Sequence, residues 1–230
     1  MLNIFFKLTW PNFYRGKLSF FSFFSYLLID KPVKTDKPVT NNNNNNKTII
    51  MDEIKTRLDK IADSYQLIYE TTDNAIVFPN IASWELNNKI TCNVIYNGVG
   101  RMIFNEPITN IPESFFLGCE NLKSIIIPSS CRVIHNFAFF TCKNLERVKF
   151  HTGLRIIGDN AFSRTAIKRV EIPSTCLYIN HHAFDESKLK YLKLITPTSA
   201  YRYFAENSIG KQIKVDGVSQ YDDFNVHTFG

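Results

Sequence analysis

The sequence predicts a solenoid of short parallel strands stacked in a curved coil, because one pattern returns at nearly constant spacing. Four phenylalanines are separated by 23, 23 and 22 residues: Phe116, Phe139, Phe162 and Phe184. An isoleucine lies five residues before each: Ile111, Ile134, Ile157 and Ile179. A small residue lies three residues after each: Cys119, Cys142, Thr165 and Ser187. One unit cannot bury its own apolar side chains, so the copies are expected to stack.

Each unit then continues into a segment with the pattern of a short strand. Apolar residues recur there as L-x-x-I-x-I, beginning at Leu122, Leu145, Ile167 and Leu189. Alternate residues should point inward, and equivalent strands should pair in parallel. A degenerate strand with Met102 and Phe104 is expected one period before Ile125. Fixed periods of this length are typical of leucine-rich-repeat solenoids, which is the fold class predicted.

Two segments carry a more specific resemblance, IPSSCRVIHNFAFFTCKNLERV and HTGLRIIGDNAFSRTAIKRVEIP. Their shared pattern IP…I…AF..C..L..V resembles the BspA-like (Treponema-type) leucine-rich-repeat family over residues 108–196. The resemblance implies a curved solenoid used for adhesion or protein binding. Members of that family are often found on cell surfaces.

The rest of the chain predicts three further segments around the solenoid at 108–196. Residues 1–50 are expected to be a disordered leader and a linker that contains an uninterrupted run, Asn41–Asn46. Residues 51–107 are expected to form an N-terminal cap, with an amphipathic helix from Met51 followed by short strands. Residues 197–230 are expected to form a C-terminal cap that includes a helix-compatible stretch, Ser199–Glu206. We take Met51 as the start of the folded unit.

The apolar run from Leu18 to Ile29 bears on where the protein acts. Its twelve residues are too few to span a bilayer as a helix, which takes about 20 apolar residues. As a signal-peptide core it would have a long lead-in and no small-x-small cleavage site after it. We therefore expect an intracellular, cytoplasmic protein without a stable membrane span. The alternative is an exported, adhesin-like protein on the cell surface.

Charge and motif content argue against nucleic-acid binding and catalysis. The net charge is +6, but Lys and Arg outnumber Asp and Glu by five within residues 1–50 and by one in the remainder. No aromatic stacking platform or long basic stripe accompanies the repeats, so no nucleic acid is expected as a partner. The chain has no HExxH, phosphate-binding glycine loop, G-x-S-x-G or calcium-loop motif. We predict no enzyme, no catalytic residue, no cofactor and no metal ion.

The cysteines and histidines occupy repeat columns, which favours packing and turn roles over chemistry. The five cysteines include no CxxC pair: Cys92, Cys119, Cys131, Cys142 and Cys176. Thr165 and Ser187 fill the column of Cys119 and Cys142, so small size explains that position better than a disulfide does. Its polar group could meet the backbone inside a tight corner. The histidines do not converge on one point, as metal ligands must.

The outward side of the strands is the predicted binding surface. Residues that alternate with the core positions should face out on the concave sheet, and we select Arg101, Arg147, Lys149, Arg169, Tyr191 and Lys193. Repeat proteins often bind partners on this face. We expect a partner protein with an acidic surface. The alternative is a solvated strand face, because exposed strands commonly carry Lys and Arg.

Overall fold

The computed structural model of the protein describes residues 55–80, 84–87, 89–180, 182–194 and 214–216. The chain divides into two compact units, residues 8–60 in one and residues 1–7 and 61–230 in the other. In the first unit the described part is helical over residues 55–59, within the helix predicted from Met51. The predicted leader and linker and the stretch Ser199–Glu206 lie outside the described residues.

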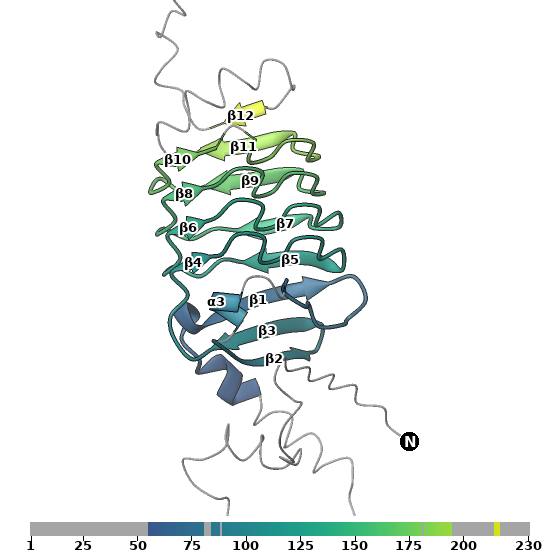
Figure 1. Ribbon diagram of the computed structural model, residues 1–230, viewed down its shortest axis with the longest axis vertical. Helices are drawn as coiled ribbons and strands as arrows, with labels where there is room; N and C mark the ends of the chain where they lie inside the picture. Colours follow the sequence, from purple (N-terminus) through teal and green to yellow (C-terminus); the bar gives the residue numbers. More distant parts are fainter. Residues whose placement is uncertain (1–54, 81–83, 88, 181, 195–213, 217–230) are drawn as a thin grey trace, which may run out of the picture. The chain divides into compact units, whose positions relative to one another are not determined.

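The second unit contains the predicted solenoid, whose coils each pass through a short strand and then a longer one (Figure 1). The short strands form a parallel sheet in the order β10-β8-β6-β4: β4 (Asn110–Ile111), β6 (Val133–Ile134), β8 (Ile156–Ile157) and β10 (Tyr178–Ile179). The longer strands are β5 (Leu122–Ile126), β7 (Arg147–Lys149), β9 (Arg169–Ile172) and β11 (Tyr191–Leu194). β5 pairs with β7 and β9 with β11, in parallel and at the repeat register. The solenoid prediction is confirmed.

An antiparallel hairpin and a third strand precede the coils. They are β1 (Gln66–Thr71), β2 (Ile90–Tyr96) and β3 (Val99–Phe104), with a short 3-10 helix η1 (Asp63–Tyr65) before β1 and a short helix α3 (Trp84–Asn87) before β2. Their sheet continues into the solenoid in the order β2-β3-β1-β5-β7. The hairpin turns at Asn97 and Gly98, both with positive φ, as the tight turns between antiparallel strands require.

The placement of β3 differs from the repeat-based expectation. Met102 and Phe104 lie in a strand and are buried, but β1 separates that strand from β5. Gly100 permits the close contact between β3 and β1: a Cβ there would lie 2.1 Å from Cε2 of Tyr69, so the ring fills the space of the missing side chain. The polypeptide before the first full coil is therefore a β-hairpin arrangement and not one more parallel coil.

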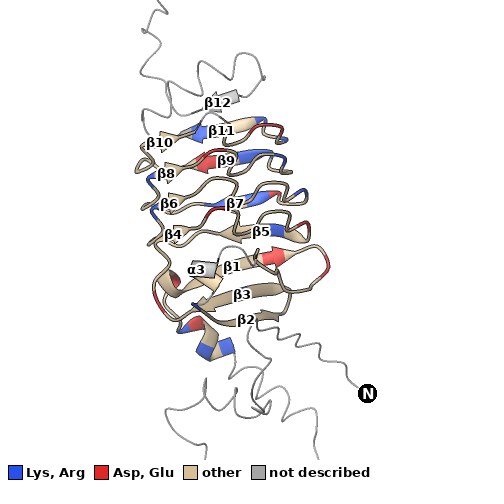
Figure 2. Ribbon diagram, viewed as in Figure 1, with Lys and Arg blue, Asp and Glu red and all other residues tan. Residues whose placement is uncertain are grey.

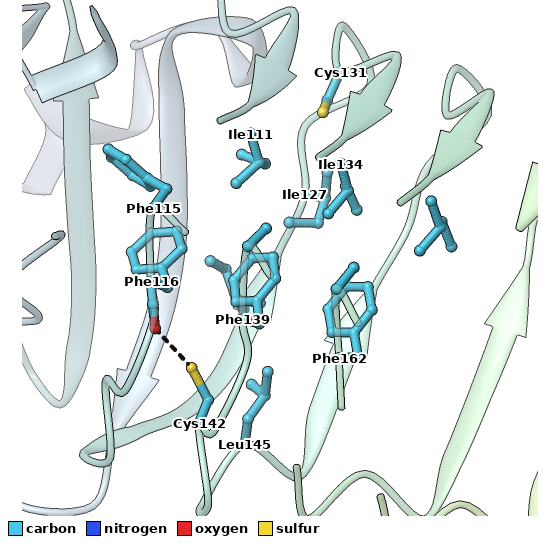
Figure 3. Packing of buried hydrophobic residues seen from close by; sticks show 14 of the residues in the cluster. Ile111, Phe115, Phe116, Ile127, Cys131, Ile134, Phe139, Cys142, Leu145 and Phe162 are labelled. Carbon is cyan, nitrogen blue, oxygen red and sulfur yellow. Dashed lines mark hydrogen bonds between the residues drawn. The ribbon is translucent and has the colours of Figure 1, made fainter. Parts of the chain in front are cut away.

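The four repeat phenylalanines form a continuous stack of rings through the core, and Figure 3 shows three of them, Phe116, Phe139 and Phe162. Ring centroids are 5.1 Å apart between Phe116 and Phe139, 4.9 Å between Phe139 and Phe162, and 5.3 Å between Phe162 and Phe184. The planes are within 17° of parallel at every step. Each ring thus packs against the equivalent ring of the next coil, which is how units too small to have cores of their own share one.

The turns around each phenylalanine are joined to the next coil by backbone hydrogen bonds. The N–H of Phe139 donates to the carbonyl of Ala161 at 2.8 Å, and the N–H of Thr141 donates to the carbonyl of Ser163 at 3.1 Å. Residues two before or two after the phenylalanines have left-handed φ angles: Ser114, Phe137, Asn160, Gly118, Thr141, Arg164 and Glu186. The repeat therefore fixes an unusual backbone conformation as well as the side-chain pattern.

The small position after each phenylalanine meets the backbone as predicted. Cys142 Sγ donates to the carbonyl of Phe116, in the preceding coil, at 3.0 Å. Thr165 Oγ1 donates to the carbonyl of Phe162, in its own coil, at 2.8 Å. Either bond satisfies a carbonyl inside the corner, so thiol and hydroxyl are interchangeable there.

Beyond the last predicted unit, the strand β12 (Lys214–Asp216) extends the sheet. It pairs in parallel with β11, with Lys214 opposite Tyr191 and Asp216 opposite Lys193. Parallel stacking thus continues past residue 196, into the segment predicted to be a cap.

Candidate interaction surface on the long strands

The outward side of β5, β7, β9 and β11, with Glu70 of the adjacent strand β1, is here called the long-strand face, and it presents the residues that alternation predicted. Along β9, Arg169 and Glu171 are exposed while Val170 and Ile172 are buried. Arg147 and Lys149 are likewise exposed on β7. The alternation follows from the pleat of the strand, which sends successive side chains to opposite sides.

The parallel register collects these side chains into two rows. Arg169 lies directly opposite Tyr191, and Arg147 opposite Ser124, which makes one row. The second row contains Ile126 opposite Lys149, and Glu171 opposite Lys193. Five of the six predicted site residues therefore lie on this face. Figure 2 shows the resulting mixture, with Lys and Arg on β7, β9 and β11 and acidic residues on β9 and β1.

Arg101 is the sixth predicted residue, and its position one coil before β5 is wrong. It lies on β3, opposite Ile68 of β1, and Ile68 in turn lies opposite Ile126 of β5. Two strand spacings, about 10 Å, thus separate it from β5. Its Nη1 donates to Oε1 of Gln66 at 2.9 Å. The displacement has the same cause as that of β3, the insertion of β1.

Three of the predicted basic residues have partners on the face itself. Arg147 Nη2 lies 2.6 Å from Oε2 of Glu70, and Lys193 Nζ lies 3.5 Å from Oε1 of Glu171. The Arg169 guanidinium carbon lies 4.4 Å from the centre of the Tyr191 ring, a cation–π contact. The charge of the long-strand face is therefore partly compensated.

Glu70 is a residue of this surface that the repeat pattern could not reveal. It lies on β1 opposite Ser124, in a strand outside the repeats and antiparallel to them. The run of apolar residues around it indicates a strand but not which strand it pairs with. Only the strand order brings its carboxylate to Arg147.

The comparison with protein families agrees with this architecture. The family described as "BspA type Leucine rich repeat region" matches residues 85–214 with six copies of its repeat. The chain belongs to this family. The match begins before residue 108 and ends after residue 196, so it takes in β2, β3 and β12 as well as the predicted solenoid.

A crystal structure of a leucine-rich repeat protein from Bacteroides ovatus is also similar to this BspA-type chain. The sequences are 23% identical over a match that covers 44% of this chain and 38% of that one, with a TM-score of 0.29. The chain therefore matches well under half the length of that protein. No curated protein matches the chain.

The cysteines of this BspA-type repeat protein are packing residues, as predicted. All five are buried and free of disulfides. Burial raises the pKa of Cys92, Cys119 and Cys131 to about 12 and that of Cys176 to about 11, and it raises the pKa of Cys142 as well. A thiol with such a pKa is protonated at neutral pH and is a poor nucleophile.

The histidines are spread over the coils. His135 is exposed, and His182 Nδ1 lies 2.6 Å from Oδ2 of Asp185. In the described part of the chain, no three His, Cys, Asp or Glu side chains gather as metal ligands would. None of the helices in that part of the chain has the length and apolar character needed to cross a membrane.

Proposed function

We propose that this protein is a non-enzymatic interaction module that binds a partner protein through its long-strand face. Repeats of this family build a scaffold suited to protein–protein interaction. The observation that carries the proposal is the register that places Arg169 and Tyr191 side by side, with Lys149 and Lys193 in the next row. A regular array of exposed side chains on a rigid sheet is a surface that a partner can recognise with little ordering cost.

The stacked pair of Arg169 and Tyr191 is the centre of the proposed contact. Arg and Tyr are enriched among the residues that dominate binding energy. The cation–π contact holds the guanidinium against the ring before any partner arrives, which limits the rotamer entropy lost on binding. The guanidinium carries five N–H donors with which it can bind an acceptor on the partner.

The partner surface is expected to be acidic. Lys149 is exposed between the ion pairs Arg147–Glu70 and Lys193–Glu171. Lys168 and Lys190 are exposed immediately before β9 and β11. With the cations of β7, β9 and β11 the positive groups are six, Arg147, Lys149, Lys168, Arg169, Lys190 and Lys193, against the three carboxylates of Glu70, Glu146 and Glu171. Complementary charge would increase the association rate and select against basic partners.

The experiment is quantitative capture of partner proteins by the tagged full chain, followed by mass spectrometry. Reversing Lys149→Glu and Arg169→Glu should reduce the yield of the true partner at least tenfold. Lys55→Glu with Lys60→Glu makes the same change in net charge at exposed positions outside the solenoid and should leave capture unchanged. Equal capture by both double variants would contradict the long-strand face as the binding surface.

The cellular location stays a prediction. The stretch Leu18–Ile29, on which the choice between a cytoplasmic and an exported protein depends, lies outside the described residues. N-terminal sequencing of the native protein distinguishes the two. Cleavage near residue 30 would favour export, and a start at Met51 would favour the cytoplasm.

A further inference from the structure

The outward side of the short strands β6, β8 and β10, together with the residue directly before each strand, forms a second surface, here called the short-strand face. It consists of Arg132, Val133, Arg155, Ile156, Leu177 and Tyr178. We propose that the short-strand face binds an acidic amphipathic helix of a partner protein, with the helix lying along the stack of coils.

The apolar part of this face is a column formed by Val133, Ile156 and Tyr178. Polar side chains would be expected at these positions on a solvated surface. Val133 lies opposite Ile156, and Ile156 opposite Tyr178, at successive coils. Ile156 is 39% exposed, Tyr178 51% and the adjacent Leu177 55%. Among the described residues only five large apolar side chains are this exposed, and three of them are on this face. Such clustering marks an interaction site better than scattered exposed residues do.

The basic part of the face runs beside that column. Arg132 and Arg155 occupy equivalent positions in adjacent coils, and both are exposed (blue beside β6 and β8 in Figure 2). The backbone N–H of Arg155 donates to the carbonyl of Arg132 at 2.7 Å, so the two residues are direct neighbours along the stack. Leu177 occupies the position equivalent to Arg132 and Arg155 in the next coil, because its N–H donates to the carbonyl of Arg155 at 2.8 Å.

The two arginines differ from Arg147 of the long-strand face in lacking a carboxylate partner. In the described part of the chain neither Arg132 nor Arg155 forms an ion pair; the guanidinium of Arg132 instead donates to the carbonyl of Ser129. Residues 128–135, 151–158 and 173–180, which build the face, contain no Asp or Glu. The nearby carboxylate of Asp63 accepts from the N–H and hydroxyl of Ser129. The face therefore has positive charge available to an acidic ligand.

The face is also held rigid from coil to coil. Ser130 Oγ donates to the carbonyl of Ile108 at 2.7 Å, and Thr175 Oγ1 donates to the carbonyl of Leu154 at 2.9 Å. Each of these bonds joins one coil to the coil before it. A surface ordered in advance loses little entropy when a ligand binds.

The spacing of the apolar column favours a helix as the ligand. Successive strands are about 4.8 Å apart, so Val133, Ile156 and Tyr178 follow one another at that interval along the stack. A helix advances about 5.4 Å per turn, whereas alternate residues of an extended chain are about 6.7 Å apart. Apolar residues one turn apart on a helix thus meet consecutive coils. Acidic residues beside them would meet Arg132 and Arg155.

The chemistry of the face fits a protein better than a nucleic acid or a membrane. An apolar centre with a polar or charged border is the usual anatomy of a protein interface. Nucleic-acid binding at physiological salt relies on many phosphate contacts, and this face offers two arginines. Stable membrane attachment needs a larger apolar area than three side chains provide.

The test uses the full chain and fluorescently labelled synthetic peptides in an anisotropy titration. The first peptide is an alanine-based helix with Leu at i, i+4 and i+7 and Glu at flanking positions. The second has the same composition with its Leu residues placed at every second position. The third carries Lys in place of every Glu. We expect the first peptide to bind at least tenfold more tightly than either of the others.

Variants then locate the binding. Arg132→Glu with Arg155→Glu, and separately Ile156→Thr, should each weaken the first peptide about tenfold or more. Lys149→Glu with Arg169→Glu, on the long-strand face, should leave its affinity within about twofold. This outcome is independent of whether the long-strand face binds its own partner.

Several results would overturn the proposal. One is absence of binding by the first peptide, and another is equal binding of the second or third peptide. A third is unchanged affinity in both short-strand-face variants. A fourth is tighter binding of single-stranded DNA or of phosphatidylserine-containing vesicles that the Arg132 and Arg155 reversals abolish, since this would assign the face to a different class of ligand.

Discussion

Arg147 and Glu70 form an ion pair across an intervening strand, with Nη2 and Oε2 2.6 Å apart. Arg147 lies on β7 and Glu70 on β1, and Ser124 of β5 lies between them in the register. The small side chain of Ser124 leaves room for the two long side chains to meet above it. The pair therefore joins the antiparallel N-terminal strands to the first parallel coils, and it also removes one positive charge from the long-strand face.

Replacing Glu70→Gln should change binding more than stability. Both side chains are about half exposed, so solvent screens the pair and its loss should cost at most about 1 kcal/mol of unfolding free energy. The same change leaves Arg147 without a carboxylate partner and should strengthen binding of an acidic partner, with a larger effect at low salt. Urea unfolding measures the first effect, and affinity at two salt concentrations measures the second. A large loss of stability would mean that the pair has a structural role that its exposure does not indicate.

The phenylalanine stack predicts a graded response to truncation along the solenoid. Phe139 is fully buried between two rings, so Phe139→Ala should lower the unfolding free energy by about 3–5 kcal/mol. Phe184 is 7% exposed and has a neighbouring ring of the repeat on one side in the described structure, so Phe184→Ala should cost less. The order of the two urea midpoints, followed by circular dichroism, tests the idea. Equal midpoints would show that the core does not act as a stack of dependent coils.

The repeat pattern predicted what depends on nearest neighbours along the stack. The inward position of Phe116 and its equivalents, the parallel register of Arg169 and Tyr191, and the corner role of Cys142 all follow from a period of 22 or 23 residues. Each coil contacts the next in the same way, so the residues at one repeat position share the same structural environment.

What the repeat pattern missed depends on pairing outside the repeat. The position of β1 between β3 and β5 pairs strands that are far apart in sequence and antiparallel, and no period encodes that choice. Arg101 was misplaced for this reason. The short-strand face was not predicted, although the sequence contains the signal for it. Val133, Ile156 and Tyr178 each precede a core position, and their shared apolar character is visible when the repeats are aligned.

Two glycines of the solenoid should differ in how strongly their substitution affects stability. A Cβ on Gly153 would lie 2.1 Å from the carbonyl oxygen of Ser129, so Gly153→Ala forces two coils apart and should destabilise the protein by more than about 1 kcal/mol. Gly118 has a φ of 70°, but Thr141, Arg164 and Glu186 adopt left-handed angles at the same repeat position. Gly118→Asn should therefore change the melting temperature little. Comparable losses of stability in the two variants would contradict the conclusion that the space beside Gly153 is too small for a Cβ.

The buried thiols predict a specific loss of stability in alkaline solution. Burial raises the pKa of Cys119 to about 12 in the folded protein, from an ordinary value of 9.0, and it raises the pKa of Cys142 well above that value too. Above about pH 9 the unfolded chain loses these protons while the folded chain keeps them, so the unfolding free energy falls as pH rises. The loss should approach about 1.4 kcal/mol per pH unit for each thiol.

A double variant isolates that contribution from lysine and tyrosine titration. Cys119→Ser with Cys142→Thr places hydroxyls in a column that already holds Thr165 and Ser187, and each new hydroxyl can donate to a phenylalanine carbonyl as theirs do. Between about pH 8 and about pH 10.5 the variant should lose less stability than the unaltered protein, while the two should have similar slopes near neutral pH. In the native protein the thiols should react with a disulfide reagent only after unfolding in urea. Parallel pH profiles, or rapid labelling of the folded chain, would show that these cysteines are accessible and that the column does not bury them.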